Sequence, residues 1–175
     1  MLLACESPDD GHLYSLSKEM PVTKVEFAKG ISLRFYSAYS FVKTGTGITI
    51  SDQDLRWMFN RQGDRAKAGI NYSPGTSLAV RRPIRISISF RDHNSHKYLQ
   101  KNCGRSKSVH KLQFCYKISR DEENAGSGGQ EYEITGWAKI PGKSYIIFSA
   151  TKQAEFTRPE RVFDPVWVIL STLRY

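Results

Sequence analysis

Residues 78–90 read LAVRRPIRISISF, and apolar side chains recur at alternate positions along most of this stretch. Successive side chains of a strand point to opposite faces of a sheet, so the pattern predicts a half-buried strand over Leu78–Phe90. The apolar face consists of Leu78, Val80, Ile84, Ile86, Ile88 and Phe90, and the polar face of Arg81, Arg85, Ser87, Ser89 and Arg91. Pro83 has no backbone N–H to donate, which favours an edge or a bulge there. The stretch predicts a sheet with one face in the core and the other exposed.

Other parts of the chain predict further strands. Four segments repeat the alternation: Ile31–Val42, Lys111–Ile118, Glu131–Ile140 and Ser144–Phe156. Pro141-Gly142-Lys143 has the residues of a tight turn, so the last two of these segments form a predicted hairpin. Residues 121–129 are acidic and glycine-rich, which predicts a flexible turn. The continuous apolar run in Val166–Leu173 predicts a buried final strand.

One helix is predicted after the first long strand. Ser51 and Asp54 can accept hydrogen bonds from free amides of a first helical turn, and Leu55 and Phe59 follow at helical spacing. This pattern predicts a helix over Asp52–Gln62. The order of elements predicts an α+β fold, in which an antiparallel sheet of about five to six strands has one or two helices packed on one face. Residues 1–20 are polar and predict a flexible arm, and residues 21–175 predict a single globular domain.

The charge of the chain is concentrated in one segment. The formal net charge is +9, and residues 81–120 hold eleven bases and one acid, a net of +10, so the rest of the chain nets −1. Such a block favours an anionic partner. The predicted anion-binding residues, for membrane, nucleocapsid or RNA, are Arg81, Arg82, Arg85, Arg91, Lys97, Lys101, Arg105, Lys107 and Lys111. Only Tyr98 supplies an aromatic ring among the basic loop residues, which disfavours readout of bases by stacking.

No pattern in the chain predicts catalysis, a metal or a cofactor. The three cysteines are few and odd in number, which favours a reducing compartment without a disulfide framework. The spacing of His93, His96, Cys103, His110 and Cys115 does not match the paired ligands of structural zinc sites. No nucleophile elbow is present. Gly142-Lys143-Ser144 echoes a phosphate-binding loop, but five residues instead of four separate Gly136 from Gly142 and a predicted strand follows, and residues 44–47 (TGTG) lack the required lysine. The chain is therefore predicted not to be an enzyme.

The order of these parts resembles the matrix proteins of rhabdoviruses, most of all the short ones of plant-infecting members. The resemblance rests on Ile31–Val42, on Leu55-Arg56-Trp57-Met58-Phe59, on Arg81-Arg82-Pro83-Ile84-Arg85-Ile86 and on the apolar residues 165–170. It implies a non-enzymatic virion protein that binds the viral nucleocapsid or RNA and an anionic membrane surface. It also implies self-association through the N-terminal arm, and a location in the virion and host cytoplasm, at membranes, with the nucleus as an alternative.

A second hypothesis belongs to another class. The same basic block could serve an RNA-binding viral accessory protein, such as a silencing suppressor or a movement protein, through contacts with RNA phosphates. An enzyme ranks third. Measuring salt-dependent binding to lipid vesicles and to RNA side by side would separate the first two hypotheses.

Overall fold

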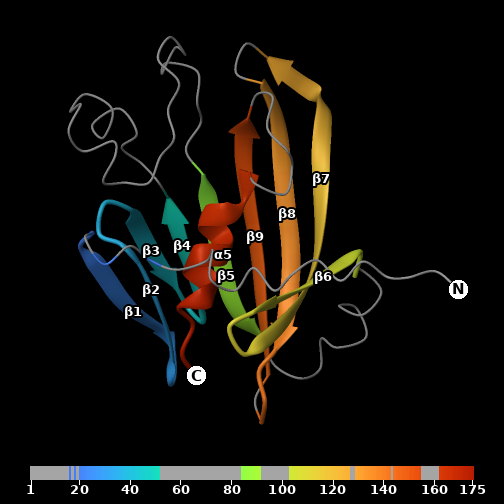
Figure 1. The fold of residues 1–175 in the computed structure, drawn as a ribbon. Helices are drawn as coiled ribbons and strands as arrows, with labels where there is room; N and C mark the ends of the chain where they lie inside the picture. The colour runs from blue at the N-terminus through green and yellow to red at the C-terminus, as the bar shows by residue number, and fades with distance from the viewer. Residues whose placement is uncertain are drawn as a thin grey trace, which may run out of the picture.

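The computed structural model describes residues 20–51, 84–91, 103–126, 129–142, 144–154 and 162–175, together with residues 16 and 18. Figure 1 shows a tall twisted sheet, a small sheet beside it and one short helix, coloured red, in front of the tall sheet. In this part of the chain, nine strands form two antiparallel sheets, and one helix accompanies them. None of the described helices is long and apolar enough to cross a membrane.

The large sheet contains seven strands in the order β3-β4-β5-β9-β8-β7-β6. Their bounds are β3 (Ser40–Thr44), β4 (Gly47–Ser51), β5 (Arg85–Arg91), β9 (Tyr145–Ala154), β8 (Gly129–Lys139), β7 (Leu112–Gly126) and β6 (Arg105–Val109). All neighbours pair antiparallel. β3 and β6 are the two edges of the sheet.

Alternation along the strands gives the large sheet two different faces. Ile48, Ile88, Phe148 and Gly136 lie directly opposite one another on four adjacent strands, and all four are buried. We call the face that carries them the core face. Gly136 is required there, because a Cβ at this position would lie 2.5 Å from Cε1 of Phe148 and 2.6 Å from the carbonyl oxygen of Cys115.

The predicted strand Leu78–Phe90 is confirmed where the structure describes it. β5 spans Arg85–Arg91, with Ile86 and Ile88 buried and Arg85 and Arg91 exposed. Residues 78–83 and the predicted helix Asp52–Gln62 lie outside the described residues.

The hairpin near the C-terminus is also confirmed. β8 and β9 pair along their length, and Gly142 takes the positive φ of 66° that the turn requires. β7 begins as predicted, but it extends to Gly126, so the predicted flexible turn at 121–129 is largely strand. Pairing with β8 stabilises that extension, although a register shift falls between Asp121 and Gly126.

The predicted single strand Ile31–Val42 is wrong. β2 (Ile31–Tyr36) pairs with β1 (Val22–Ala28) in a separate two-stranded sheet, and the chain then turns into β3 of the large sheet. The N–H of Tyr39 donates to the carbonyl of Tyr36 at 3.0 Å and closes this turn. Apolar residues fall at odd-numbered positions both before and after the turn, as Phe35 and Phe41 show. The sequence pattern therefore continues through the turn and predicts one strand where there are two.

The predicted final strand Val166–Leu173 is also wrong. Residues Asp164–Ser171 form the helix α5, which buries Val166, Trp167, Ile169 and Leu170. A continuous apolar run fits a buried helix as well as a buried strand. Pro165 is suited to the first helical turn, and the carboxylate of Asp164 is favourable at the positive end of the helix dipole.

Helix α5 covers the core face and ties the two sheets together. Figure 1 shows it in front of β5 and β9, and the Trp167 ring centroid lies 5.5 Å from that of Phe148 and 6.0 Å from that of Phe114. The N–H of Arg34 in β2 donates to the hydroxyl of Thr172 at 2.7 Å. Ser32 and Arg174 exchange backbone hydrogen bonds of 2.9 and 2.8 Å. The C-terminal segment therefore holds the small sheet against the rest of the core.

The predicted fold class needs correction on these grounds. The described chain is mostly β, with sheets of seven and two strands and one short helix, instead of an α+β fold with one sheet of five to six strands. β4 and β6 were not predicted, since β4 adjoined the expected helix and β6 lies in a segment expected to be irregular. The helix that packs on the sheet comes from an apolar run taken for a strand.

Candidate binding surface

The second face of the large sheet carries a row of mostly polar residues that crosses nearly all of its strands, whereas the next row on this face includes the apolar side chains of Ile147 and Trp137. Val42, Thr49, Ser87, Ser149, Thr135 and Lys117 lie directly opposite one another, one on each of six adjacent strands. We call the face that carries this row the polar face. Thr135 and Lys117 are exposed, whereas Thr49, Ser87 and Ser149 are half-buried. Thr49, Ser87, Ser149 and Thr135 form a row of hydroxyls across the twisted sheet.

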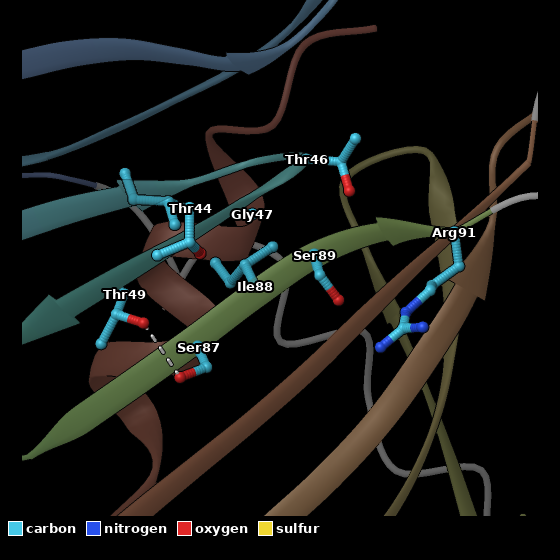
Figure 2. Close-up of a pocket in the computed structure, with 9 residues that line it drawn as sticks. Thr44, Thr46, Gly47, Thr49, Ser87, Ile88, Ser89 and Arg91 are labelled. Carbon is cyan, nitrogen blue, oxygen red and sulfur yellow. Dashed lines mark hydrogen bonds between the residues drawn. The ribbon is translucent and has the colours of Figure 1, made fainter.

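A pocket of about 370 Å³ opens on the polar face at the β3–β4 turn and β5. Its lining residues are Thr44, Thr46, Gly47, Ile48, Thr49, Ser87, Ile88, Ser89 and Arg91. Figure 2 shows Thr49 and Ser87 together on one side, Ser89 further along β5, and Arg91 at the end of that strand. Gly47 stands directly opposite Ser89, so the pocket wall has no side chain at that position.

Hydrogen bonds hold two sides of the pocket. The hydroxyl of Thr46 donates to the carbonyl of Phe90 at 3.1 Å, and the N–H of Phe90 donates to the carbonyl of Thr46 at 2.9 Å. The hydroxyl oxygens of Thr49 and Ser87 lie 3.3 Å apart, and Figure 2 marks this contact. Gly45 permits the tight turn through its positive φ of 55°. These bonds fix the turn relative to β5.

The lining is suited to binding. It contains five hydroxyl side chains and one guanidinium, and none of the nine residues is a carboxylate, a histidine or a cysteine. An arginine keeps its proton and donates only, so it cannot act as a general base. The hydroxyls have no adjacent base among these residues that would activate a nucleophile. The chemistry on offer is hydrogen bonding to a polar, preferably anionic, group.

The nine predicted anion-binding residues do not gather into one site. Arg81, Arg82, Lys97 and Lys101 lie outside the described residues. Arg85 and Arg91 are exposed on the polar face of β5. Arg105 and Lys107 are on β6, directly opposite Tyr116 and Phe114, which places them on the side of the core face. Lys111 is exposed in the turn between β6 and β7.

Strand order separates these residues further. Three strands lie between β5 and β6, which corresponds to about 20 Å at the usual spacing of neighbouring strands. Lys107 is near helix α5, with its Nζ 5.5 Å from the centroid of the Trp167 ring. Among the five predicted residues that the structure describes, Arg91 alone lines the pocket. Whether the set binds an anion stays a prediction.

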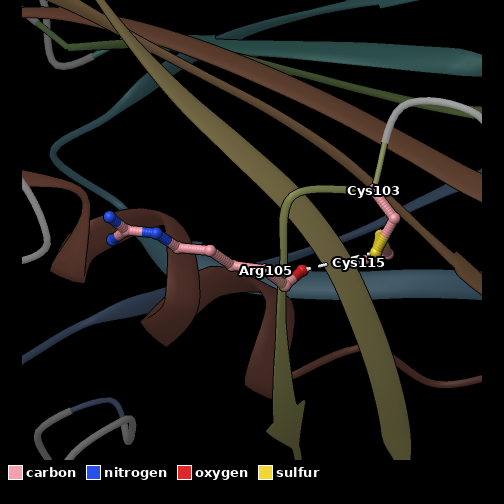
Figure 3. Close-up of a disulfide and its surroundings, with 3 residues drawn as sticks. All are labelled: Cys103, Arg105 and Cys115. Atoms are coloured by element: carbon pink, nitrogen blue, oxygen red, sulfur yellow. Dashed lines mark hydrogen bonds between the residues drawn. A yellow bond between two sulfur atoms is a disulfide. The ribbon is translucent and has the colours of Figure 1, made fainter.

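The prediction that the cysteines form no disulfide framework is wrong for one pair. Cys103 and Cys115 form a disulfide, with their Cα atoms 5.4 Å apart, a usual separation for such a bond. Figure 3 shows it beside the start of β6, where Sγ of Cys103 lies 3.6 Å from the carbonyl oxygen of Arg105. An odd cysteine count does not preclude one pair, and the β6–β7 turn brings these two together. The bond encloses β6 in a covalent loop.

Metal-ligand geometry is not found in the described part of the chain, where no group of three or more His, Cys, Asp and Glu residues is placed to hold an ion. Cys103 and Cys115 are bonded to each other, and Nε2 of His110 lies 3.3 Å from Nη1 of Arg174. His93 and His96 lie outside the described residues.

The pocket hydroxyls were missed at the level of sequence. At Thr44 and Thr46 the sequence indicates only an incomplete phosphate loop, and at Ser87 and Ser89 it indicates only the solvent side of a strand. A hairpin signal was present, since Gly45 sits within a short turn between two runs that contain β-branched residues. The two threonines and the two serines come together only because β4 pairs with β5, a strand more than 30 residues away in the sequence.

Fold and site together define a mostly β protein with an open, hydroxyl-lined binding pocket. Comparison with protein families then assigns it: residues 61–174 match the model of Tsi3, the type six secretion immunity 3 domain, and the chain belongs to that family. No curated protein matches it. The match begins before β5 and includes β5 to β9 and α5.

A solved structure shares the fold. A crystal structure from Bacteroides thetaiotaomicron VPI-5482 aligns with a TM-score of 0.50 and 8% sequence identity, over 89% of this chain and 48% of that one. The chain thus spans about half the length of this structural relative. At such low identity the similarity concerns the fold alone.

The family match corrects the viral interpretation. A type six secretion immunity domain is bacterial, so the resemblance to rhabdovirus matrix proteins is wrong, as are the virion and host locations that it implied. The nucleocapsid, RNA and membrane partners, and the self-associating arm of a matrix or accessory protein, are withdrawn with it. A basic segment signals association without identifying the partner. The apolar residues 165–170, taken as a closing strand, are helical.

Proposed function

We propose that the chain is an immunity protein, which binds the cognate effector of a bacterial type six secretion system and protects the cell that produces it. The observation that carries this proposal is the family match over residues 61–174. The polar face supports it, because a rigid, hydroxyl-rich sheet surface with a pocket is suited to recognising another protein.

Inhibition by binding, without catalysis, is the mechanism that fits this site. The pocket offers donors and acceptors but no acid, base or activated nucleophile among its lining residues. An inhibitor of this kind acts by occupying the effector. Its effect should therefore saturate at a fixed molar ratio of chain to effector, whereas an enzyme would act at much lower ratios.

An oxidising compartment, such as the bacterial periplasm, fits the disulfide. Cys103 is exposed, and disulfides persist where thiols are not kept reduced. We therefore propose that the chain meets its effector outside the cytoplasm.

Competition between sister strains tests the proposed function. A strain of the source bacterium that lacks this gene is grown in contact with its parent, and with a parent whose type six secretion is disabled. The mutant should be lost only beside the secreting parent, and the full chain supplied in trans should restore it. Equal survival of the mutant beside both parents would overturn the proposal.

A further inference from the structure

The pocket on the polar face presents an arginine that the described residues leave uncompensated. Arg91 is exposed at the end of β5, and no carboxylate of the described chain lies within ion-pair distance of it. Arg85, at the other end of β5, has a carboxylate on the same face. Thr151 of β9 stands opposite Arg85, and Glu133 of β8 stands opposite Thr151. Arg91 lies six positions beyond Arg85, which is about 20 Å along a strand.

Two more donors border the same pocket. Within the described chain, the hydroxyls of Thr44 and Ser89 have no hydrogen-bond partner, whereas those of Thr46, Thr49 and Ser87 are engaged. Figure 2 shows Ser89 on the same strand as Arg91. Thr44 lies on β3, two strands away from Ser89, and Gly47 of β4 stands between them. The guanidinium can only donate, and a hydroxyl donates or accepts as its partner requires.

We propose that this pocket accepts an aspartate or glutamate side chain of the effector, with the carboxylate bound by Arg91 and by the hydroxyl of Ser89. A guanidinium binds a carboxylate through two parallel N–H donors, and such charge-assisted pairs are stronger than neutral ones. A pocket of about 370 Å³ has room for one acidic side chain and its backbone. The net charge of +9 favours an acidic partner.

This inference rests on the proposed function, so its test begins with the wild-type chain. The probe is the secreted protein that the immobilised full chain retains from culture medium of the source bacterium, purified and identified. Affinity for that protein is then measured for the wild type and for variants. Failure of the wild type to retain a protein whose secretion depends on the type six system would count against the proposed function itself.

The decisive comparison is between two arginines on one strand. Arg91→Ala should weaken binding at least about tenfold, because it removes both the positive charge and the two parallel N–H donors of the guanidinium. Arg91→Lys keeps the charge but not the paired donors, so it should recover only part of the loss. Arg85→Ala removes the same charge from the same face outside the pocket and should change affinity by less than about twofold. If wild type binds and Arg91→Ala binds equally well, the pocket proposal fails while the proposed function stands.

Filling the pocket gives a second, independent test. Ser89→Tyr adds a ring where the carboxylate would lie, and tyrosine is well accepted in strands, so folding should persist. Lys24→Tyr adds the same ring at an exposed position of β1, in the separate two-stranded sheet. The proposal requires a folded Ser89→Tyr chain to lose binding and Lys24→Tyr to keep it. Retained binding in both would overturn it.

A final step identifies the bound group. Single acidic residues of the purified effector are replaced by lysine, and each replacement is tested with wild type and with Arg91→Glu. One effector position should lose binding to wild type and regain it with Arg91→Glu. If binding depends on Arg91 but no charge exchange restores it, the bound group is not an acidic side chain, and the proposal is contradicted.

Discussion

The two faces of the seven-stranded sheet are made by the same strands and have opposite roles. On the core face, Ile88 and Phe148 are almost fully buried, and the Phe148 ring packs against Trp167 of α5. On the polar face, the residues one position away, Ser87 and Ser149, are half-buried hydroxyls. Alternation lets one strand serve the core and a binding surface together. Substitutions at neighbouring positions should therefore separate stability from recognition.

The largest effect is expected from an acid placed on the core face of β8. Ile134 is fully buried, so Ile134→Asp would bury an unpaired carboxylate, at a cost of several kcal/mol, and should unfold the chain. Thr135→Asp, one residue further, faces solvent and should leave the thermal midpoint nearly unchanged. Circular dichroism melts of the two variants measure this. Similar melts would show that the two faces are not distinct.

Loss of the disulfide ranks second. Cys103 and Cys115 are 12 residues apart, and a closed loop of that size contributes about 3 kcal/mol in the loop-entropy model. Cys103→Ala combined with Cys115→Ala should lower the free energy of unfolding by about that amount. Reducing agent should destabilise the wild type and leave the double variant unaffected. A wild type insensitive to reduction would argue that β6 does not need the bond.

Crowding the core face at Gly136 should cost about 2 kcal/mol, typical of overpacking. The added methyl of Gly136→Ala would meet the Phe148 ring and a backbone oxygen, both at less than 3 Å. Gly104→Ala is the matched control, because its methyl would lie 3.5 Å from the nearest atom, the carbonyl oxygen of Tyr116. Chemical denaturation of both variants decides the point. A stable Gly136→Ala chain would mean that β7, β8 and β9 pack less closely than described.

The smallest effect concerns Lys107, at the edge of the core face. Its ammonium lies over the Trp167 ring, a contact worth about 0.5–1 kcal/mol at an exposed site. Lys107→Gln should lose roughly that stability, whereas Lys117→Gln, on the polar face of β7, should lose less. Tryptophan fluorescence during urea unfolding reports both. An equal loss of stability in the two variants would mean that the lowered net charge, and not the contact with Trp167, causes the effect.

Sequence patterns predicted the regular strands well. Ile86, Ile134 and Ile146 sit where alternation puts them, and Gly142 makes the turn between β8 and β9. In these strands each residue's environment follows from its neighbours along the chain. The break between Tyr36 and Ser40 cannot be predicted in this way, because a turn can preserve the alternation while the chain passes from one sheet to the other.

The helix and the candidate site depend on contacts between distant residues. An apolar run such as 166–170 becomes helix because it lies against Phe114 and Phe148, which the run itself does not encode. Counting charges found Arg91 but could not separate it from Lys107, which strand order puts on the opposite face. The pocket requires β4 beside β5, and the disulfide requires the β6–β7 turn.

Side-chain footprinting of the complex tests most directly whether the polar face is the binding face. Hydroxyl radicals label accessible side chains in the free chain and in the chain bound to its purified effector. The account predicts that Arg91 on the polar face becomes protected, while Lys107 and Lys111 at the β6 edge react as before. Protection confined to Lys107 and Lys111, with Arg91 still labelled, would contradict it.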